Sequence, residues 1–320
     1  MQTIIIDGSF LTYKSFFAFK NRHLSIEVDG NTITTSSVFG FLREIIRIAI
    51  GKNFPTIMVA WDKPPYLKKT EFPSYKERPK REDVPSMALE KELIIAILHD
   101  LCIPSICSNG YEGEDVINSI IKLIKKEYEK IYAYTNDEDC FALLSKNVFL
   151  INSKRDKETK RSEFDITTKK DLFNKYSVTP KEFRYFKALT GCRSDTVSGV
   201  NGIGPSGAKW LINTFGNLDK IKANLNNIKK QKPTIAKKLR KAYKDGSLET
   251  SIYLTRIQTP INLIRLFPET NLGFKKILEF IEAETLLEGS NLLTLRKLKE
   301  SQTKVIGRIE RKIKWKNEKL

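Results

Sequence analysis

Residues 110–120 read GYEGEDVINSI, which sets Glu112, Glu114 and Asp115 at the start of an apolar helical pattern. Acidic side chains in the first turn of a helix complement its macrodipole, so helix capping alone could account for these three carboxylates. The chain as a whole carries a formal net charge of +18. The flanking sequence has to show whether the carboxylates also serve a site for a cation.

Three short apolar runs each end in acidic residues: TIIID at 3–7, TIMVAWD at 56–62 and KIYAYTNDED at 130–139. Their β-branched and aromatic residues predict strands. Helical patterns, among them residues 38–50, separate these runs. The alternation of strand and helix predicts an α/β fold with a central parallel-type sheet and flanking helices.

The carboxyl ends of parallel strands share one edge of a sheet, where ligands bind. The acidic residues expected there are Asp7, Asp62, Asp137 and Asp139, and the cluster that begins at Glu112 opens a helix beside them. Carboxylates gathered at one edge repel one another unless a cation neutralises them. Hard oxygen ligands without His or Cys suit Mg²⁺ or Mn²⁺, so the sequence favours a divalent-metal site over helix capping alone.

The charge balance indicates a polyanionic partner, because 56 Lys and Arg residues face 38 Asp and Glu residues. Nucleic acid and an acidic membrane surface both fit that balance. The longest apolar runs are too short for a membrane span, and the amino terminus lacks the features of a signal peptide. We therefore expect a cytoplasmic protein without a membrane partner.

Residues 63–85 are rich in proline and lack apolar periodicity, and their lysines and arginines are interleaved with Tyr66, Phe72 and Tyr75. Most charge runs of this kind are solvated loops. A basic segment with aromatic rings beside a metal site also suits a path for single-stranded nucleic acid, since cations bind phosphates and rings stack on bases.

Glycines cluster at 197–217, in VSGVNGIGPSGAKWLINTFGN, directly before an apolar helical pattern. Gly202, Gly204 and Gly207 would let the backbone approach a phosphate closely, and the first turn of the helix offers free N–H groups. The very basic stretch IKKQKPTIAKKLRKAYKDG follows at 228–246. This pattern indicates a helix-hairpin-helix element that grips nucleic-acid phosphates.

In order along the chain, these motifs resemble those of the 5′-nuclease superfamily, which includes flap endonucleases and the 5′–3′ exonucleases of phages and of the amino terminus of bacterial DNA polymerase I. The resemblance covers residues 1 to about 265. It implies a PIN-like nuclease domain at 1–179 with a helical arch at about 63–86. A helix-three-turn-helix DNA-binding subdomain at 180–265 and a basic helical extension at 266–320 would follow.

The resemblance also implies roles for individual residues. IIIDGSFLTYK resembles the first motif of the superfamily, with Lys14 at a basic position that contacts DNA. FPSYKERPK is similar to the arch element, so Lys76 and Arg78 would act on the scissile phosphate and Tyr75 would contact DNA. The glycine hairpin, together with Lys209, would bind duplex DNA and hold a K⁺ ion.

Two divalent ions, Mg²⁺ or Mn²⁺, are implied in the same way. The first would be held by Asp7, Asp62, Glu112 and Glu114, with Asp115 as a ligand or directly behind them, and the second by Asp137, Asp139 and Asp195. In GCRSD at 191–195, Cys192 stands where the superfamily has a carboxylate. A thiol is a poor partner for Mg²⁺, so we expect the second site to be weakened.

We therefore predict an enzyme, a structure-specific 5′ nuclease that hydrolyses DNA phosphodiesters near 5′ ends and junctions by two-metal catalysis, in replication or repair. Its expected partners are 5′ flaps, DNA ends, junctions and RNA primer–DNA hybrids, and we expect a monomer. The alternative is a catalytically weakened protein that binds DNA ends or junctions, which Cys192 favours. A phosphohydrolase of the haloacid-dehalogenase kind is disfavoured, because the strand that ends at Asp7 continues Gly-Ser rather than x-Asp.

Overall fold

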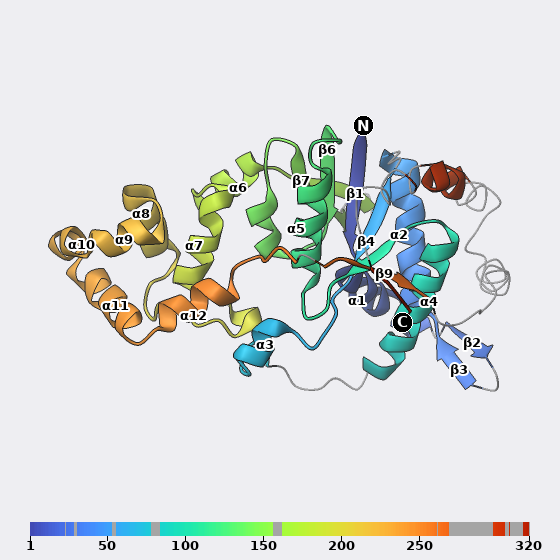
Figure 1. The fold of residues 1–320 in the computed structure, drawn as a ribbon, viewed down its shortest axis with the longest axis horizontal. Coiled ribbons are helices and arrows are strands. Elements are labelled where there is room, and N and C mark those ends of the chain that lie inside the picture. Colours follow the sequence, from blue (N-terminus) through green and yellow to red (C-terminus); the bar gives the residue numbers. More distant parts are fainter. Residues whose placement is uncertain are drawn as a thin grey trace. The chain divides into compact units, whose positions relative to one another are not determined.

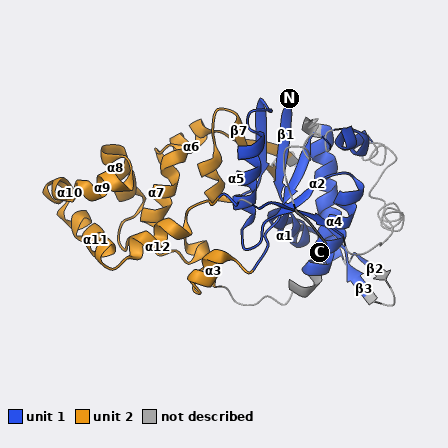
Figure 2. Cartoon of the chain, viewed as in Figure 1, with its two compact units in different colours: residues 1–64, 79–136, 259–320 blue, residues 65–78, 137–258 orange. Residues whose placement is uncertain are grey.

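The computed structural model describes residues 1–22, 24–28, 31–52, 56–77, 84–155, 162–260, 262–268, 297–304, 307 and 316–319. The chain divides into two compact units (Figure 2). Unit 1 comprises Met1–Pro64, Pro79–Asn136 and Thr259–Leu320, and unit 2 comprises Pro65–Arg78 and Asp137–Gln258.

Unit 1 contains strands in the order β10-β9-β5-β4-β1-β6 (Figure 1). The strands are β1 (Gln2–Asp7), β4 (Ile57–Ala60), β5 (Ser105–Cys107), β6 (Lys130–Tyr134), β9 (Ile264–Phe267) and β10 (Lys316–Lys319). β1 pairs parallel with β4 and with β6, so that Ile4 lies opposite Ile57 and Tyr132. β5 pairs parallel with β4, whereas β9 pairs antiparallel with β5.

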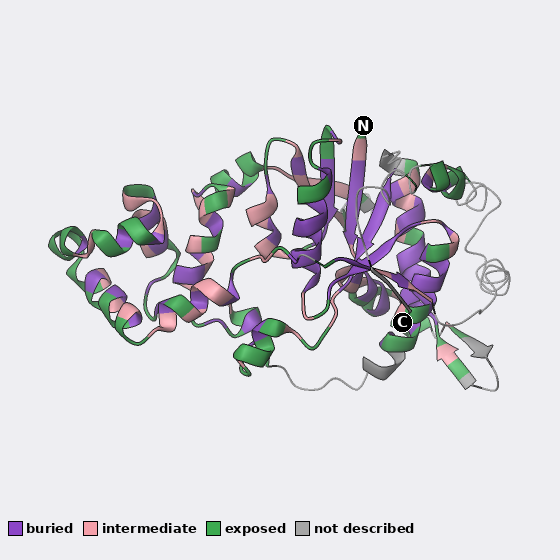
Figure 3. Ribbon diagram, in the orientation of Figure 1, coloured by how far each residue is buried: buried purple, intermediate pink, exposed green. Residues whose placement is uncertain are grey.

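The central strands of unit 1 are apolar along their length and buried (Figure 3). Ile4, Ile5 and Ile6 of β1 have no exposed surface, and neither do Ile57 and Val59 of β4. Continuous β-branched runs are typical of parallel strands whose two faces are both covered. Polar groups on these strands are therefore confined to the strand ends, where Asp7 closes β1.

Helices cover this sheet. α1 (Gly8–Phe19), α2 (Ser36–Lys52) and α4 (Val84–Asp100) pack on one another, and α5 (Gly113–Ile124) packs against β1, β4 and β5. The short helix η1 (Lys20–Arg22) and the antiparallel pair β2 (Ser25–Val28) and β3 (Asn31–Thr34) connect α1 to α2. The predicted α/β fold with a parallel-type sheet and flanking helices is confirmed.

Unit 2 is mainly helical. Its helices are α3 (Leu67–Glu71), η2 (Glu138–Leu143), α6 (Lys169–Tyr176), α7 (Pro180–Thr190), η3 (Arg193–Asp195), α8 (Pro205–Phe215), α9 (Leu218–Ala223), α10 (Leu225–Gln231), α11 (Pro233–Lys244) and α12 (Ser247–Leu254). The strands β7 (Val148–Arg155) and β8 (Ser162–Thr167) pair antiparallel.

The two units divide the chain differently from the domain boundary expected at residues 179 and 180. The rings of Phe141, Tyr176 and Phe183 lie with centroids 5.2 to 6.0 Å apart, so η2 and α6 share an aromatic core with α7. Within the expected arch, α3 and the turn up to Glu77 are described, but residues 78–83 lie outside the described part of the chain. Residues 269–296, 305–306 and 308–315 of the expected carboxyl-terminal extension also lie outside it.

Candidate active site

In unit 1, carboxylates from two strand ends converge on the first residue of α5. Oδ1 of Asp62, which follows β4, accepts a hydrogen bond of 2.6 Å from the backbone N–H of Gly113. A Cβ atom added at Gly113 would lie 3.1 Å from Oδ1 of Asp62 and 3.5 Å from Oδ1 of Asp7. Asp7 and Asp62 therefore reach the same edge, as the strand ends predicted, and Gly113 is a contact that the sequence reading missed.

The start of α5 holds the other three carboxylates of this group, which are buried, with 3% of Glu112, 7% of Glu114 and 1% of Asp115 exposed. Glu112 is the N-cap residue and forms a capping box with Asp115, whose Oδ2 accepts from the Glu112 N–H at 3.4 Å. Helix capping is thus correct for two of these residues. Glu114 takes no part in the capping box, so capping does not account for its burial.

Asp7 is oriented by two further donors. Its Oδ1 accepts from the backbone N–H of Phe10 at 2.9 Å, which makes Asp7 the N-cap of α1, and its Oδ2 accepts from Oγ1 of Thr135 at 2.9 Å. Thr135 directly follows β6 and was not singled out from the sequence. Asp7 and Asp62 thus lie at the N-termini of α1 and α5, where the helix dipoles partly offset their negative charge.

Lys14 lies inside a polar network of unit 1. Its Nζ donates to Oη of Tyr134 at 2.9 Å, and that hydroxyl donates to Glu44, which also accepts from Arg47. Burial lowers the pKa of Lys14 and outweighs the opposite effect of Glu44. The expected DNA contact of Lys14 stays a prediction, since the structure shows the ammonium engaged within the protein.

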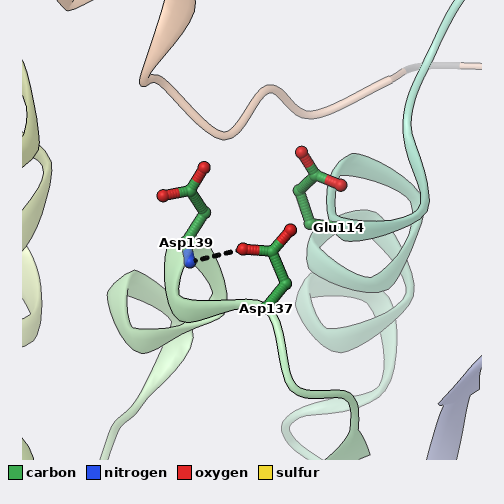
Figure 4. Close-up of side chains that lie close together, drawn as sticks. All are labelled: Glu114, Asp137 and Asp139. Atoms are coloured by element: carbon green, nitrogen blue, oxygen red, sulfur yellow. Dashed lines mark hydrogen bonds between the residues drawn. The ribbon is translucent and has the colours of Figure 1, made fainter. Parts of the chain in front are cut away.

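In unit 2, Asp137 and Asp139 lie at the start of η2. Oδ1 of Asp137 accepts from the backbone N–H of Asp139 at 2.8 Å (Figure 4). Burial raises the pKa of Asp137, and the neighbouring carboxylate of Asp139 raises it further. Burial and mutual repulsion thus destabilise the charged form of this pair, and a nearby cation would stabilise it.

A lysine that the sequence reading did not single out supplies such a cation. Nζ of Lys187, on α7, lies 2.9 Å from Oδ1 of Asp139, in a close charge contact, and donates to Sγ of Cys192 at 3.3 Å. Burial lowers the pKa of Lys187, but the charge of Asp139 and the contact with Cys192 more than offset this effect and raise it. Lys187 is therefore a firmly charged ammonium among the residues expected to hold a second metal ion.

Asp195 ends η3 and is 8% exposed. Its Oδ2 accepts a hydrogen bond of 3.0 Å from Sγ of Cys192, and its Oδ1 lies 3.8 Å from Nζ of Lys76. Burial and the hydrogen bond to Asp195 raise the pKa of Cys192, so its sulfur carries a proton. The thiol of Cys192 thus donates to Asp195 rather than adding an anionic ligand.

The structure does not fit the expected DNA contact of Tyr75. The ring is 2% exposed and packs with Val197 and Leu254 in a small core, against which Phe72 and Tyr253 also lie. A ring enclosed in this way has no face for a base to stack on, so its aromatic character serves the packing of unit 2. Arg78 lies outside the described residues.

The glycine-rich hairpin leads into α8, whose N-cap is Gly204. A Cβ at Gly204 would meet no atom within 4 Å, whereas one at Gly202, where φ is +77°, would lie 2.5 Å from Nζ of Lys238. That Nζ donates to the carbonyl of Gly202 at 2.6 Å. A Cβ at Gly207 would make ordinary contacts, and Lys209 donates to the carbonyl of Lys175 at 3.4 Å. The open space at Gly204 is the feature that suits close approach of a ligand.

No helix in the described part of the chain is long and apolar enough to cross a membrane. The fold and the residues together define a class of protein. Carboxylates at the edge of a parallel sheet, a second acidic group beside lysines and a glycine-led hairpin in a basic helical unit are the features of metal-dependent nucleases.

Comparison with known proteins agrees with this class. Residues 2–177 match the family described as 5′-3′ exonuclease, N-terminal resolvase-like domain, and residues 178–272 match 5′-3′ exonuclease, C-terminal SAM fold. The chain belongs to the 5′–3′ exonuclease family.

Two relatives and one solved structure show the extent of the similarity. The 5′-3′ exonuclease of Aquifex aeolicus is 28% identical over 292 residues, which cover 90% of this chain and 95% of the relative. The thermostable DNA polymerase I of Thermus filiformis is 29% identical over 310 residues, but the chain spans only 34% of its length. The flap endonuclease of bacteriophage T5, solved with DNA and metal ions, has a TM-score of 0.60 at 19% identity and covers 96% of this chain and 100% of its own. That structure supports the fold.

Proposed function

We propose that this chain is a structure-specific 5′ nuclease that hydrolyses DNA phosphodiesters near 5′ ends and junctions. The convergence of Asp7 and Asp62 on Gly113 at the start of α5 carries the proposal. Carboxylates brought together from separate segments repel one another unless a cation balances them. Family membership supports the class of reaction, and the basic helices of unit 2 support DNA as the substrate.

The unit 1 carboxylates fit a divalent ion of the Mg²⁺ or Mn²⁺ type, because they are hard, anionic oxygens. Those of Glu112, Glu114 and Asp115 are buried as well. Asp7, Asp62, Glu112 and Glu114 would hold the ion, with Asp115 fixed behind them by the capping box. When bound, such an ion supplies a Lewis acid and a hydroxide at neutral pH.

The protein's own residues would prepare that chemistry. The N–H of Gly113 fixes the Asp62 carboxylate, and Thr135 with the N–H of Phe10 fixes Asp7, so neither side chain has to reorganise on binding. Lys76, 23% of whose side chain is exposed, would stabilise negative charge on the phosphate during cleavage. Arg78 would assist it.

The residues of unit 2 fit a second divalent ion less well. The Asp139 carboxylate is paired with Lys187, and Cys192 offers a protonated thiol. We therefore assign no step to a second ion. The hairpin likewise fits a K⁺ ion less well, because the Lys238 ammonium already donates to the carbonyl of Gly202.

The test is cleavage of a 5′-labelled flap substrate by the purified protein with Mg²⁺ or Mn²⁺, beside blunt duplex, single strand and an RNA primer–DNA hybrid. We expect cleavage at or near the junction, by a monomer, as befits a cytoplasmic enzyme of replication or repair. Absence of cleavage on every substrate, with DNA binding intact, would contradict the proposal.

That outcome would support a second candidate, a protein that binds DNA ends or junctions without cleaving them. The pairing of Asp139 with Lys187 and the thiol at position 192 are the observations that favour it. Product mapping and a binding measurement on the same flap substrate distinguish the two functions directly.

A further inference from the structure

The environment of Lys187 is unusual for a lysine. Its side chain is 12% exposed, and that of its partner Asp139 is 13% exposed. A buried ion pair of this kind persists only where the geometry and the additional hydrogen bonds offset desolvation. Here the ammonium also donates to Sγ of Cys192 at 3.3 Å, and this sulfur in turn donates to Asp195 at 3.0 Å.

A second lysine–carboxylate pair differs from this one in its exposure to water, although its carboxylate also lies on η2. Lys175 lies 2.8 Å from Glu138 of η2, but these side chains are 59% and 45% exposed. Exposed pairs of this type contribute little and are readily exchanged for water. Lys187, by contrast, is largely buried against Asp139 and Cys192, so its positive charge is held beside Asp139.

Two of the three aspartates of this group already lie beside a lysine. Asp139 is paired with Lys187, and Asp195 lies 3.8 Å from Lys76 and accepts from the thiol of Cys192. A divalent ion entering here would meet an ammonium at Asp139 and would find no carboxylate at position 192. Like charges at such short range repel strongly in a partly buried site.

We propose that the Lys187 ammonium replaces the second divalent ion, so that the chain binds a single divalent ion at the site of its proposed nuclease reaction. This inference rests on the proposed function. Lys187 acts through Asp139 and Cys192, which makes it a positioning residue that balances charge. Cys192 and Lys187 would then act together. Cys192 supplies no anionic ligand for a metal ion, and the ammonium of Lys187 provides the positive charge that the ion would otherwise bring.

The test counts bound ions. The full chain is titrated with Mn²⁺, and free Mn²⁺ is measured by electron paramagnetic resonance, which gives the number of ions bound per chain. We expect one Mn²⁺ for the wild-type protein. Two tightly bound Mn²⁺ ions would overturn the inference, and this result needs no variant.

Variants locate the cause. In Lys187→Met combined with Cys192→Asp, the tethered charge is removed and a carboxylate is supplied, so we expect a second Mn²⁺ to bind at least about tenfold more tightly than any second ion binds to the wild type. Lys187→Arg keeps the charge and should keep the count at one. Lys175→Met, the exposed control, should also bind one ion.

A count that stays at one in the double variant, with the fold intact by circular dichroism, would refute the role of Lys187. If the double variant does not fold, Cys192→Asp alone is tested. The retained ammonium should pair with the new carboxylate, so we expect one bound Mn²⁺ per chain, and two would contradict the inference. Cleavage of the flap substrate together with two wild-type ions would sink this inference while leaving the proposed function standing. A wild-type count of zero would contradict both.

Discussion

At the scale of single residues, Asp62 combines a structural and a proposed chemical role. Its Oδ1 accepts the N–H of Gly113 at 2.6 Å, which ties the segment after β4 to the start of α5. Its charge is what the proposed metal site requires. These roles separate in Asp62→Asn, because an amide oxygen can still accept from Gly113 but brings no negative charge.

We expect Asp62→Asn to lower the cleavage rate on the order of 10³-fold, because a ligand of the divalent ion loses its charge. Flap binding measured in EDTA should be unchanged, as should the melting temperature. Asp100→Asn, at the end of α4, serves as the control and should cleave normally. Cleavage by Asp62→Asn at the wild-type rate would remove Asp62 from the metal site.

Lys76 can be tested in a similar way. Because its proposed contact with the phosphate acts mainly in the transition state, Lys76→Ala should lower the single-turnover rate about 10²-fold while changing affinity little. Lys69→Ala removes an exposed lysine from the neighbouring α3 and should leave the rate unchanged. Equal losses in rate and affinity for Lys76→Ala would mean that Lys76 only binds phosphate.

At the scale of elements, the hairpin before α8 offers a substitution that the fold tolerates. A Cβ at Gly204 would meet no atom within 4 Å. Gly204→Val should therefore fold normally and yet obstruct a duplex phosphate that approaches the start of α8. We expect duplex binding, measured by fluorescence anisotropy, to weaken about tenfold with little change for a single strand. Equal weakening on both would show that the hairpin does not grip the duplex.

A buried carboxylate of α4 accepts hydrogen bonds at the start of α2. Glu90 of α4 is fully buried, and its Oε2 accepts from the N–H groups of Ser37 and Val38, while its Oε1 accepts from Thr34. The first N–H groups of a helix have no partner within the helix. Glu90 therefore joins β3, α2 and α4.

We expect Glu90→Ala to lower the free energy of unfolding by about 2 kcal/mol, because buried N–H groups lose their acceptor.

Burial raises the pKa of Glu90, although its hydrogen bonds act against this. The folded state thus favours the protonated acid, so stability declines as pH rises from the ordinary pKa of 4.5 through the raised value. Urea titrations should show this decline in the wild type and not in Glu90→Gln. A parallel decline in both would assign it to another group.

At the scale of the whole molecule, the sequence predicted the parallel strands and the acidic strand ends, because strand periodicity and the common edge of a parallel sheet are local rules. It could not predict the Lys187–Asp139 pair, which forms only when α7 packs beside η2. The burial of Tyr75 likewise depends on Val197 and Leu254, residues distant in sequence. Short-range patterns do not contain such tertiary contacts.

The net charge of +18 leads to the last prediction. Contacts between lysines and phosphates release counterions, so the affinity for duplex DNA in EDTA should fall about 10³-fold or more between roughly 50 and 200 mM salt. Lys229 and Lys230 are exposed on α10 of unit 2, whereas Lys126 and Lys130 are exposed in unit 1.

The two double variants remove the same charge from different units. If the helices of unit 2 bind the duplex, Lys229→Gln with Lys230→Gln should reduce the slope of log affinity against log salt by about 0.9 for each phosphate that these lysines neutralise in the wild type. Lys126→Gln with Lys130→Gln should leave the slope unchanged. Identical slopes for both would mean that net charge, rather than the basic helices of unit 2, attracts the DNA.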